Sequence, residues 1–334
     1  MEVLMRLRLL SKKDVQRALP MKECIELMKA AFAQLSSGQA HVPLRSQLPV
    51  TAHEGVTIFM PAYLAQSGDL GVKVVSIFPN NLKVDLPTLH AVVLVIESKT
   101  GIPMALMDGA YLTALRTGAA SGVATDLLAR KDSRVLVLFG AGGQGRTQLE
   151  GVCTVRPITK VLVCDVDPKR AKDFVEEMKG RGAPIPNDIR FIASVEEGVR
   201  EADIICTATT SNKPVFDGKA LRSGTHINAV GAYTPQMQEV DSETIRRAKV
   251  VIDSRQASLV EAGDLIIPLQ QGLITEKHIY AEIGEIVAGQ KAARESKDEI
   301  TYFKSVGIAV QDVAAARRVL DKATEMGLGQ EVEL

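Results

Sequence analysis

The chain has 334 residues, which is enough for two domains. Its 40 lysines and arginines balance its 40 aspartates and glutamates, so it carries no basic field that would attract nucleic acid or an anionic membrane. No apolar run approaches the roughly 18 residues that span a bilayer. The opening MEVLMRLRLL contains Glu2, Arg6 and Arg8, which favour a first β-strand over a signal peptide. We therefore expect a small-molecule partner, with neither nucleic acid nor membrane.

Cysteine and histidine usage sets expectations for redox compartment and metal. No pair of the four cysteines has the Cys-x-x-Cys spacing, and Cys164 and Cys206 lie in apolar runs. This pattern is typical of a reducing cytoplasm without disulfides. The five histidines show no metal-ligand spacing, so we expect no metal site.

The chain up to residue 126 mixes helix and strand without regular alternation. Apolar residues at helical spacing predict a helix from Lys12 to Ser36 and a second from Tyr111 to Arg130. Pro, Gly and Asn separate the short strands that are predicted between them. These strands are Val42–Val50, Gly55–Met60, Gly71–Phe78 and Ala91–Glu97.

After Ser133 the pattern changes to short Val- and Ile-rich strands that alternate with helices, such as Gln144–Val155 and Lys169–Lys179. The six predicted strands are Arg134–Phe139, Lys160–Asp165, Ile189–Ala193, Ala202–Ala208, Thr225–Val230 and Val250–Asp253. Such alternation predicts a doubly wound parallel sheet, and hence the α/β class. A last helix, Val310–Glu325, follows the sixth strand, and we expect it to fold back on the first domain.

The segment GAGGQG at 140–145 joins a predicted strand to a predicted helix. Gly140 permits a tight turn, Gly142 lets the backbone approach a pyrophosphate, and Gly145 lets the helix pack closely on the strand. The helix N-terminus then offers N–H groups to phosphates. Asp165 ends the next strand, where a carboxylate bonds the adenosine ribose and repels a 2′-phosphate. The sequence therefore favours NAD, although Lys169-Arg170 close by could tolerate the phosphate of NADP.

Three basic residues precede this domain. Arg116 lies among small and apolar residues of its helix, and a buried arginine needs an anion, which can be a structural partner or a substrate carboxylate. Lys73 shares a strand face with Val75 and Ile77. Desolvation there lowers a lysine pKa and suits it to proton transfer, but lysine also protects edge strands. Arg45 lies on the more polar face of its strand.

Taken together, these segments resemble the ornithine cyclodeaminase/mu-crystallin family, which includes archaeal-type alanine dehydrogenases and cyclic ketimine reductases. The combination of LTALRTGAASGVAT with GAGGQG is the most specific part of the resemblance. The matching segments are PLR at 43–45, MPAYL at 60–64, GVKVVSIFPNN at 71–81, TGIPMALMDGAYLTALRTGAASGVAT at 100–125, GAGGQG at 140–145, INAVGAYTPQMQEVD at 227–241 and FKSVGIAVQDVAAA at 303–316.

The resemblance implies roles for individual residues. Arg45 and Arg116 would hold an amino-acid carboxylate, Lys73 would lie beside the reacting carbon and nitrogen, and Asn81 would line the substrate side. The residues that it implies at the cofactor are Thr117, Gly140, Gly142, Gln144, Gly145, Asp165, Thr209, Val230 and Ser305.

The resemblance also implies a fold, a Rossmann domain plus a mixed α+β domain that binds substrate and forms a homodimer. We place the Rossmann domain at 128–308 and the second domain at 1–127 with 309–334.

One segment departs from the family pattern. Cyclodeaminases carry Gly-Asp-x-Pro-Gly-Lys-x-Glu-Leu after INAVG, and the Asp takes part in ring closure, whereas here Tyr233 occupies the position of the acid. A phenol is a poor base at pH 7 but can donate a hydrogen bond, so we count Tyr233 with Lys73 as a catalytic candidate.

We therefore expect an NAD(H)-dependent oxidoreductase of a small α-amino acid or its cyclic imine, such as an alanine dehydrogenase or a pyrroline-2-carboxylate reductase. The alternatives are an ornithine cyclodeaminase and a non-catalytic, cofactor-dependent ligand-binding protein.

Overall fold

The computed structural model describes residues 5–334 and divides the chain into two compact units. One unit contains the residues up to Arg116 together with Ile308–Leu334, and the other contains Thr117–Gly307. The division falls inside helix α3 (Gly109–Leu128), earlier than the boundary at residue 127 that the sequence suggests. The return of the C-terminal helix to the first unit makes that unit discontinuous.

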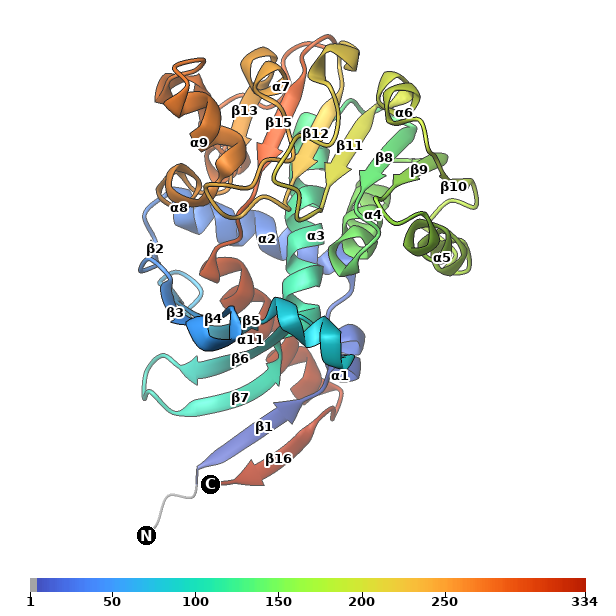
Figure 1. Ribbon diagram of the computed structural model, residues 1–334. Helices are drawn as coiled ribbons and strands as arrows, with labels where there is room; N and C mark the ends of the chain where they lie inside the picture. The colour runs from blue at the N-terminus through green and yellow to red at the C-terminus, as the bar shows by residue number, and fades with distance from the viewer. Residues whose placement is uncertain (1–4) are drawn as a thin grey trace. The chain divides into compact units, whose positions relative to one another are not determined.

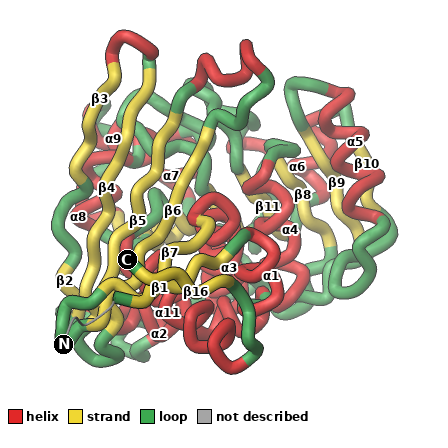
Figure 2. Tube along the Cα trace, turned by 90° about the horizontal axis from the view of Figure 1, so that it is seen from below, coloured by secondary structure: helices red, strands yellow, loops and turns green. Residues whose placement is uncertain are grey.

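The first unit is built on a mixed sheet of eight strands, which Figure 2 shows side by side. The strands run in the order β16-β1-β7-β6-β5-β4-β2, with β3 paired to β4, and only β1 and β7 pair in parallel. Their bounds are β1 Arg6–Leu10, β2 Ala40–His41, β3 Ser46–Val50, β4 Gly55–Leu64, β5 Asp69–Ile77, β6 Leu89–Glu97, β7 Pro103–Asp108 and β16 Gln330–Glu333.

Two sequence expectations for this sheet need correction. The predicted strand Val42–Val50 is wrong over its first half, because the chain leaves β2 at His41 and enters β3 only at Ser46. Strands β2, β7 and β16 were not predicted at all. Of the predicted first strand, residues 1–4 lie outside the described residues.

Three helices belong wholly to this unit: α1 (Lys12–Ala18), α2 (Met21–Ser36) and α11 (Ala309–Glu325). The single predicted helix Lys12–Ser36 is wrong, because Pro20 has no backbone N–H to continue it and serves as the extended N-cap of α2. Helix α11 packs on α2 and on the strands β4, β5 and β6. This packing buries the apolar face of the sheet and fixes the first turn of α11 against β5.

The second unit is a doubly wound sheet of eight strands, and every pairing that the structure gives is parallel. Their order is β10-β9-β8-β11-β12-β15-β13-β14. Their bounds are β8 Val135–Phe139, β9 Lys160–Cys164, β10 Ile189–Phe191, β11 Ile204–Thr207, β12 His226–Ala229, β13 Lys249–Ile252, β14 Ile279–Glu282 and β15 Thr301–Lys304. Two of these were not predicted, so α11 follows the eighth strand and not the sixth. The missed strand β15, TYFK, ends in a buried lysine and lacks an apolar run.

The chain order locates the ligand-binding edge of this sheet. From β8 the chain moves outward to β9 and β10 and then returns to the other side of β8 with β11 (Figure 1). Ligands of such sheets bind at the carboxyl ends of the strands on either side of this reversal. Helices flank the sheet: α4 Gly143–Val155, α5 Pro168–Lys179, α6 Val195–Glu201, α7 Ser242–Arg247, α8 Arg255–Glu261, α9 Gly263–Gln270 and α10 Ile283–Val287. No described helix has both the length and the apolar character that a membrane crossing requires.

Helices α3 and α4 approach each other closely through glycine. A Cβ atom on Gly118 would lie 2.2 Å from the carbonyl oxygen of Thr147, and one on Gly151 would lie 2.2 Å from that of Gly118. Both neighbours are helix backbone, so they cannot turn aside as a flexible side chain would.

We predict that Gly118→Ala lowers the free energy of unfolding by about 1–3 kcal/mol, because the added methyl group forces the two helices apart. Gly180→Ala is the matched control, since its Cβ would have only the carbonyl oxygen of Glu177 as a neighbour, at 3.7 Å. Urea denaturation measures both variants, and equal stabilities for the two would contradict the close crossing.

Candidate active site

Strand β5 turns Lys73 toward the core of the first unit. Alternation places Lys73 on the same face as Gly71 and Val75, and its side chain is 2% exposed. Helix α11 covers this face: a Cβ atom on Gly71 would lie 3.4 Å from a methyl group of Val313. A lysine in this position needs a nearby anion, because a buried charge without a partner is strongly unfavourable.

That anion is Asp312, in the first turn of α11. Its carboxylate is fully buried and lies 2.7 Å from the Lys73 ammonium, Oδ2 to Nζ. The other oxygen, Oδ1, accepts a hydrogen bond from Nε of Arg116 at 3.0 Å. One carboxylate therefore serves two buried cations, which leaves the group of three with a net positive charge.

Arg116 is held at a second point as well. Its Nη1 donates to Oε1 of Gln311 at 2.7 Å, and the same oxygen accepts the backbone N–H of Ile308 at 2.9 Å. The described residues give Nη2 of Arg116 no hydrogen-bond partner. Arg116 is therefore fixed in direction by α11, with one amino group left for a further acceptor.

The electrostatics of this cluster act mainly on Lys73. Burial lowers its pKa to about 7, Asp312 opposes this shift, and the positive charges of Arg116 and Arg45 reinforce it. Arg45 is therefore close enough for its charge to act on Lys73. An amine with a pKa near 7 exchanges protons readily at neutral pH, which suits it to acid–base catalysis.

Asp312 was missed in the sequence, although Arg116 was expected to need an anion. The signal was present: Gln311-Asp312 is a polar pair inside the otherwise apolar GIAVQDVAAA. An acidic residue in the first turn of a helix is commonly explained by the helix dipole, which hides its second role.

Asn81 lies in a short 3-10 helix, Pro79–Val84, that follows β5. Its side-chain amide nitrogen donates to the backbone carbonyl oxygen of Pro87 at 2.9 Å, and the backbone carbonyl oxygen of Asn81 accepts the N–H of Leu86 at 3.0 Å. Asn81 thus closes the turn after the strand that carries Lys73. Its role toward a substrate stays a prediction.

In the second unit, the glycine-rich loop follows β8 at the reversal of the strand order. Gly140 has φ +100°, and a Cβ there would lie 2.5 Å from the carbonyl oxygen of Ala208. A Cβ on Gly145 would lie 2.3 Å from the carbonyl oxygen of Gly140, so the helix packs closely on the loop. Gly142, in contrast, has no atom within 4 Å of such a Cβ.

Helix α4 begins directly after Gly142, and no side chain caps it. Its first N–H groups and the positive end of its dipole are therefore available to an anion, as in sites that bind a dinucleotide pyrophosphate. The open space at Gly142 is where the backbone of such a loop approaches the phosphates. The residues present fit a dinucleotide.

Asp165, directly after β9, already has hydrogen-bond partners within the protein, which the sequence did not indicate. Its oxygens accept the N–H groups of Ala141 at 2.8 Å and Asp167 at 2.9 Å, and the Arg170 guanidinium at 2.5 and 3.2 Å. Burial opposes its ionisation, but the hydrogen bonds from Arg170, Asp167 and Ala141 hold the pKa of Asp165 below its usual value. Arg170 would have to move for both oxygens to meet a ribose, and it carries the charge that a 2′-phosphate needs.

The remaining predicted cofactor residues lie in buried or half-buried positions of the second unit. Thr209 follows β11, Val230 follows β12, and Ser305 follows β15, so all three lie at the carboxyl edge of the sheet. Ser305 donates to Asp253 at 2.8 Å. Thr117 is buried on α3, and Gln144 lies in the first turn of α4.

Tyr233 lies in the loop after β12 and is 37% exposed. Partial burial raises the pKa of its phenol, so the hydroxyl is neutral at pH 7. Tyr233 can therefore donate a hydrogen bond but cannot act as a carboxylate would.

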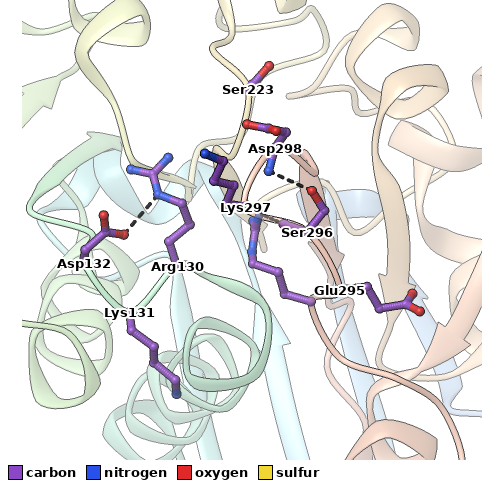
Figure 3. A pocket seen from close by; sticks show the side chains of 9 residues that line it. Arg130, Lys131, Asp132, Ser223, Glu295, Ser296, Lys297 and Asp298 are labelled. Carbon is purple, nitrogen blue, oxygen red and sulfur yellow. Dashed lines mark hydrogen bonds and ion pairs between the residues drawn. The ribbon is translucent and has the colours of Figure 1, made fainter.

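A hollow of about 530 Å³ lies at the opposite, amino-terminal edge of the same sheet (Figure 3). Its two arginines are held by partners within the protein. Arg130 pairs with Asp132 at 3.2 Å and with Asp203 at 2.7 Å, and Arg294 donates to four backbone carbonyl oxygens. We assign no binding role to it. It is lined by Arg130, Lys131, Asp132, Ser223, Arg294, Glu295, Ser296, Lys297 and Asp298.

Residues 5–334 contain no group of three or more His, Cys, Asp or Glu side chains that could hold a metal ion. All four cysteines are buried thiols. Burial raises the pKa of Cys153, Cys164 and Cys206 to about 12, so these thiols are protonated and unreactive at neutral pH. None of them is a candidate nucleophile.

The glycine-rich loop and the parallel sheet define the second unit as a dinucleotide-binding Rossmann domain. The chain matches the model of the ornithine cyclodeaminase/mu-crystallin family over residues 5–327 and belongs to that family. The predicted family and fold class are confirmed.

Relatives along nearly the whole chain include two enzymes. The chain is 39% identical to a Δ1-pyrroline-2-carboxylate reductase of Bacillus cereus, over 97% of this chain and 99% of the relative. It is 37% identical to an alanine dehydrogenase of Archaeoglobus fulgidus, over 97% of this chain and 98% of that relative. The solved Δ1-pyrroline-2-carboxylate reductase of Thermococcus litoralis, in complex with NADH and L-proline, superposes with a TM-score of 0.94 at 49% identity and covers 98% of this chain and 100% of its own.

The excess charge of the cluster predicts that Lys73→Met stabilises the fold. The variant leaves Asp312 paired one-to-one with Arg116 and removes a poorly solvated charge, so we expect a gain of about 1–4 kcal/mol at pH 6. The pKa of Lys73 is about 7 in the fold and about 10.4 in the unfolded chain, so wild-type stability rises with pH between these values. The advantage of the variant should therefore shrink from pH 6 to pH 9. Urea denaturation at both values tests this, and a variant less stable than wild type at pH 6 would refute it.

Proposed function

We propose that this protein reduces a five-membered cyclic imine carboxylate, Δ1-pyrroline-2-carboxylate, to proline. At the broader level it is an NAD-dependent oxidoreductase that acts on an amino acid or its imine, as in its relatives. The observation that carries the proposal is the buried cluster of Lys73, Arg116 and Asp312, in which two cations share one carboxylate. Such a cluster attracts an anionic substrate and holds a proton beside it.

The substrate carboxylate is held by the arginines. Arg116 is fixed by Asp312 and Gln311 and has its Nη2 group left for an acceptor. Arg45 adds a second positive charge, close enough to act on Lys73. A planar guanidinium suits a carboxylate better than an ammonium does, because its donors match the two oxygens.

Lys73 handles the proton. In the direction of reduction, the Lys73 ammonium hydrogen-bonds the imine nitrogen and supplies the proton that this nitrogen carries in the product. A pKa of about 7 lets the ammonium give up its proton and regain it from solvent. Asp312 holds the lysine in place and supports its protonated form.

The dinucleotide, when bound, supplies the hydride that is added to the imine carbon. One imine, one hydride and one proton give one amine, so no other reactant is needed. Residues 140–145 and the first turn of α4 would hold the pyrophosphate. NAD(H) is the cofactor that we propose, in agreement with its presence in the related structures.

Tyr233 argues against the lyase alternative. Ring closure in a cyclodeaminase uses a carboxylate at this position, and the neutral phenol of Tyr233 cannot replace it. A hydrogen bond from the phenol to the imine or to the substrate carboxylate remains available. We therefore favour reduction of a ring that is already closed.

We also propose that the protein is a homodimer in the cytoplasm. In the first unit, apolar side chains are exposed on and beside the sheet: Leu48 is 59% exposed, Phe59 38% and Val92 41%. Exposed apolar groups of this kind mark association surfaces. An alanine dehydrogenase neighbour, 36% identical, is described as a dimer with bound NAD. The buried cysteine thiols support a reducing compartment.

The direct test is NADH absorbance at 340 nm with four substrates: Δ1-pyrroline-2-carboxylate, its six-membered analogue, pyruvate with ammonia, and ornithine. We expect stoichiometric NADH oxidation with the five-membered imine and proline as product. Lys73→Met should lower kcat by a factor of about 10²–10⁴, because proton transfer by one correctly placed group typically contributes a rate factor of that size. The affinity for NADH should stay unchanged.

Proline formed from ornithine without net change in NADH would instead establish the cyclodeaminase. Tight imine binding without turnover would establish a ligand-binding protein.

A further inference from the structure

Glu239 is a fully buried carboxylate that lies outside the cluster described above. It follows the loop that contains Tyr233, and none of its atoms is exposed to solvent. Burying a carboxylate is strongly unfavourable unless its oxygens are all well bonded. The bonds that Glu239 makes are therefore informative about its purpose.

The carboxylate of Glu239 accepts five hydrogen bonds, one from the last residue of β11 and four from the loops after β11 and β12. Oε1 accepts the backbone N–H and the hydroxyl of Thr209, at 2.6 and 2.8 Å. Oε2 accepts the hydroxyl of Thr207 at 3.0 Å and the backbone N–H groups of Gly231 and Ala232 at 2.7 and 2.9 Å. Thr207 and Thr209 stand at the end of β11, and Gly231 and Ala232 just after β12.

These two loops touch each other and the glycine-rich loop. A Cβ on Gly231 would lie 2.2 Å from the carbonyl oxygen of Thr209 and 2.4 Å from Oε1 of Glu239. A Cβ on Gly140 would lie 2.5 Å from the carbonyl oxygen of Ala208 and 3.2 Å from a methyl group of Thr209. The ends of β8, β11 and β12 are thus packed into one surface at the strand-order reversal.

Glu239 is itself fixed from behind. Its backbone N–H and that of Val240 donate to Oδ1 of Asp264, at 2.7 and 3.0 Å. Oδ2 of Asp264 accepts the Lys304 ammonium at 2.9 Å and the Tyr302 hydroxyl at 3.1 Å. All of these side chains are fully buried. The position of Glu239 is therefore set by β15 and α9, and the two loops take their position from Glu239.

We propose that Glu239 is the positioning residue of the dinucleotide site, which shapes the β11 and β12 loops for the cofactor without touching it. The inference rests on the proposed function, because that function identifies the ligand of these loops as NAD(H). Secondary structure alone does not hold these loops, since both strands end before Thr209 and Gly231. A side chain that accepts from both loops at once is what keeps them at a fixed separation.

Glu239→Gln is the decisive substitution. Each oxygen of Glu239 accepts at least one backbone N–H, so the amide nitrogen of glutamine would face a backbone donor in either orientation. Hydroxyl groups can rotate, but backbone N–H groups cannot, so one loop must move away. The volume and shape of the side chain remain nearly the same.

Asp203→Asn is the matched control. Asp203 is also a buried carboxylate that accepts two backbone N–H groups, from Arg134 and Val135 at 2.8 and 3.0 Å. It precedes β11 and thus lies at the amino-terminal edge of the same sheet, away from the cofactor loops. Both substitutions are expected to lower the midpoint of thermal unfolding.

The readout is the Kd for NADH, measured by NADH fluorescence with wild type and both variants. We expect Glu239→Gln to weaken NADH binding about 10- to 100-fold, the loss expected for hydrogen bonds to a charged group. We expect Asp203→Asn to change the Kd by less than about twofold at a similar loss of thermal stability. An NADH affinity of Glu239→Gln equal to that of wild type, or an equal loss in both variants, would overturn the proposal.

A second variant covers a failure of Glu239→Gln to fold. Thr207 is fully buried, and Thr207→Val keeps a β-branched side chain while it removes one of the five hydrogen bonds to Glu239. This variant should weaken NADH binding about threefold to tenfold. Unchanged affinity in Thr207→Val would then overturn the proposal. Wild-type protein that binds no NADH would contradict the proposed function itself, which separates the two failures.

Discussion

A single buried carboxylate, Asp312, sets the arrangement of the first unit's chemistry. It joins β5 to α3 through the Lys73 ammonium and the Arg116 guanidinium, and it stands in the helix that closes the core of this unit. Because one negative charge faces two positive charges, the cluster is balanced only when another anion arrives. Burial lowers the pKa of Lys73, and Asp312 opposes this shift. Asp312 also accepts a hydrogen bond from Arg116 and so helps to orient it, which links substrate binding and proton transfer through one carboxylate.

In the second unit, too, buried carboxylates hold functional parts of the chain in position. Its ligand-binding edge consists of loops, and buried carboxylates hold their backbone N–H groups. Glu239 serves the loops after β11 and β12, Asp165 accepts the N–H of Ala141 in the glycine-rich loop, and Asp253 accepts those of Val306 and Gly307 after β15. The rigid strands bring these loops together, and the acidic side chains give them their final shape. Acidic residues near a cofactor edge thus need not touch the cofactor.

Much of this architecture is predictable from the sequence, because it follows from local pattern. Alternation in GVKVVSIF places Lys73 on an apolar face, and the apolar neighbours of Arg116 predict its burial. The glycine spacing predicts the dinucleotide loop in the same way. Each of these signals is contained within about ten residues, and each is tied to one strand or one helix.

The features that escaped prediction depend on long-range partners. Asp312 is distant from Lys73 in sequence, and its place in the first turn of a helix already has a local explanation in the helix dipole, which outweighs the signal of a polar pair in an apolar run. Strand β15, TYFK, was missed because it lacks an apolar run and ends in Lys304, whose charge Asp264 compensates in the fold. The break at Pro20, in contrast, could have been predicted from the sequence. Proline is common at the start of a helix, so Pro20 should have divided the predicted helix Lys12–Ser36 into two.

The central claim is that Asp312 supports the protonated form of Lys73, and the pH dependence of kcat/KM tests it most directly. Reduction of Δ1-pyrroline-2-carboxylate requires the Lys73 ammonium, so kcat/KM of the wild type should fall as pH rises through about 7. Asp312→Asn removes the charge that raises the pKa of Lys73, so the same decline should move to lower pH. The ionisation of the free substrate is common to both proteins and cancels in the comparison. A decline that stays at the wild-type pH, or moves to higher pH, would contradict the account.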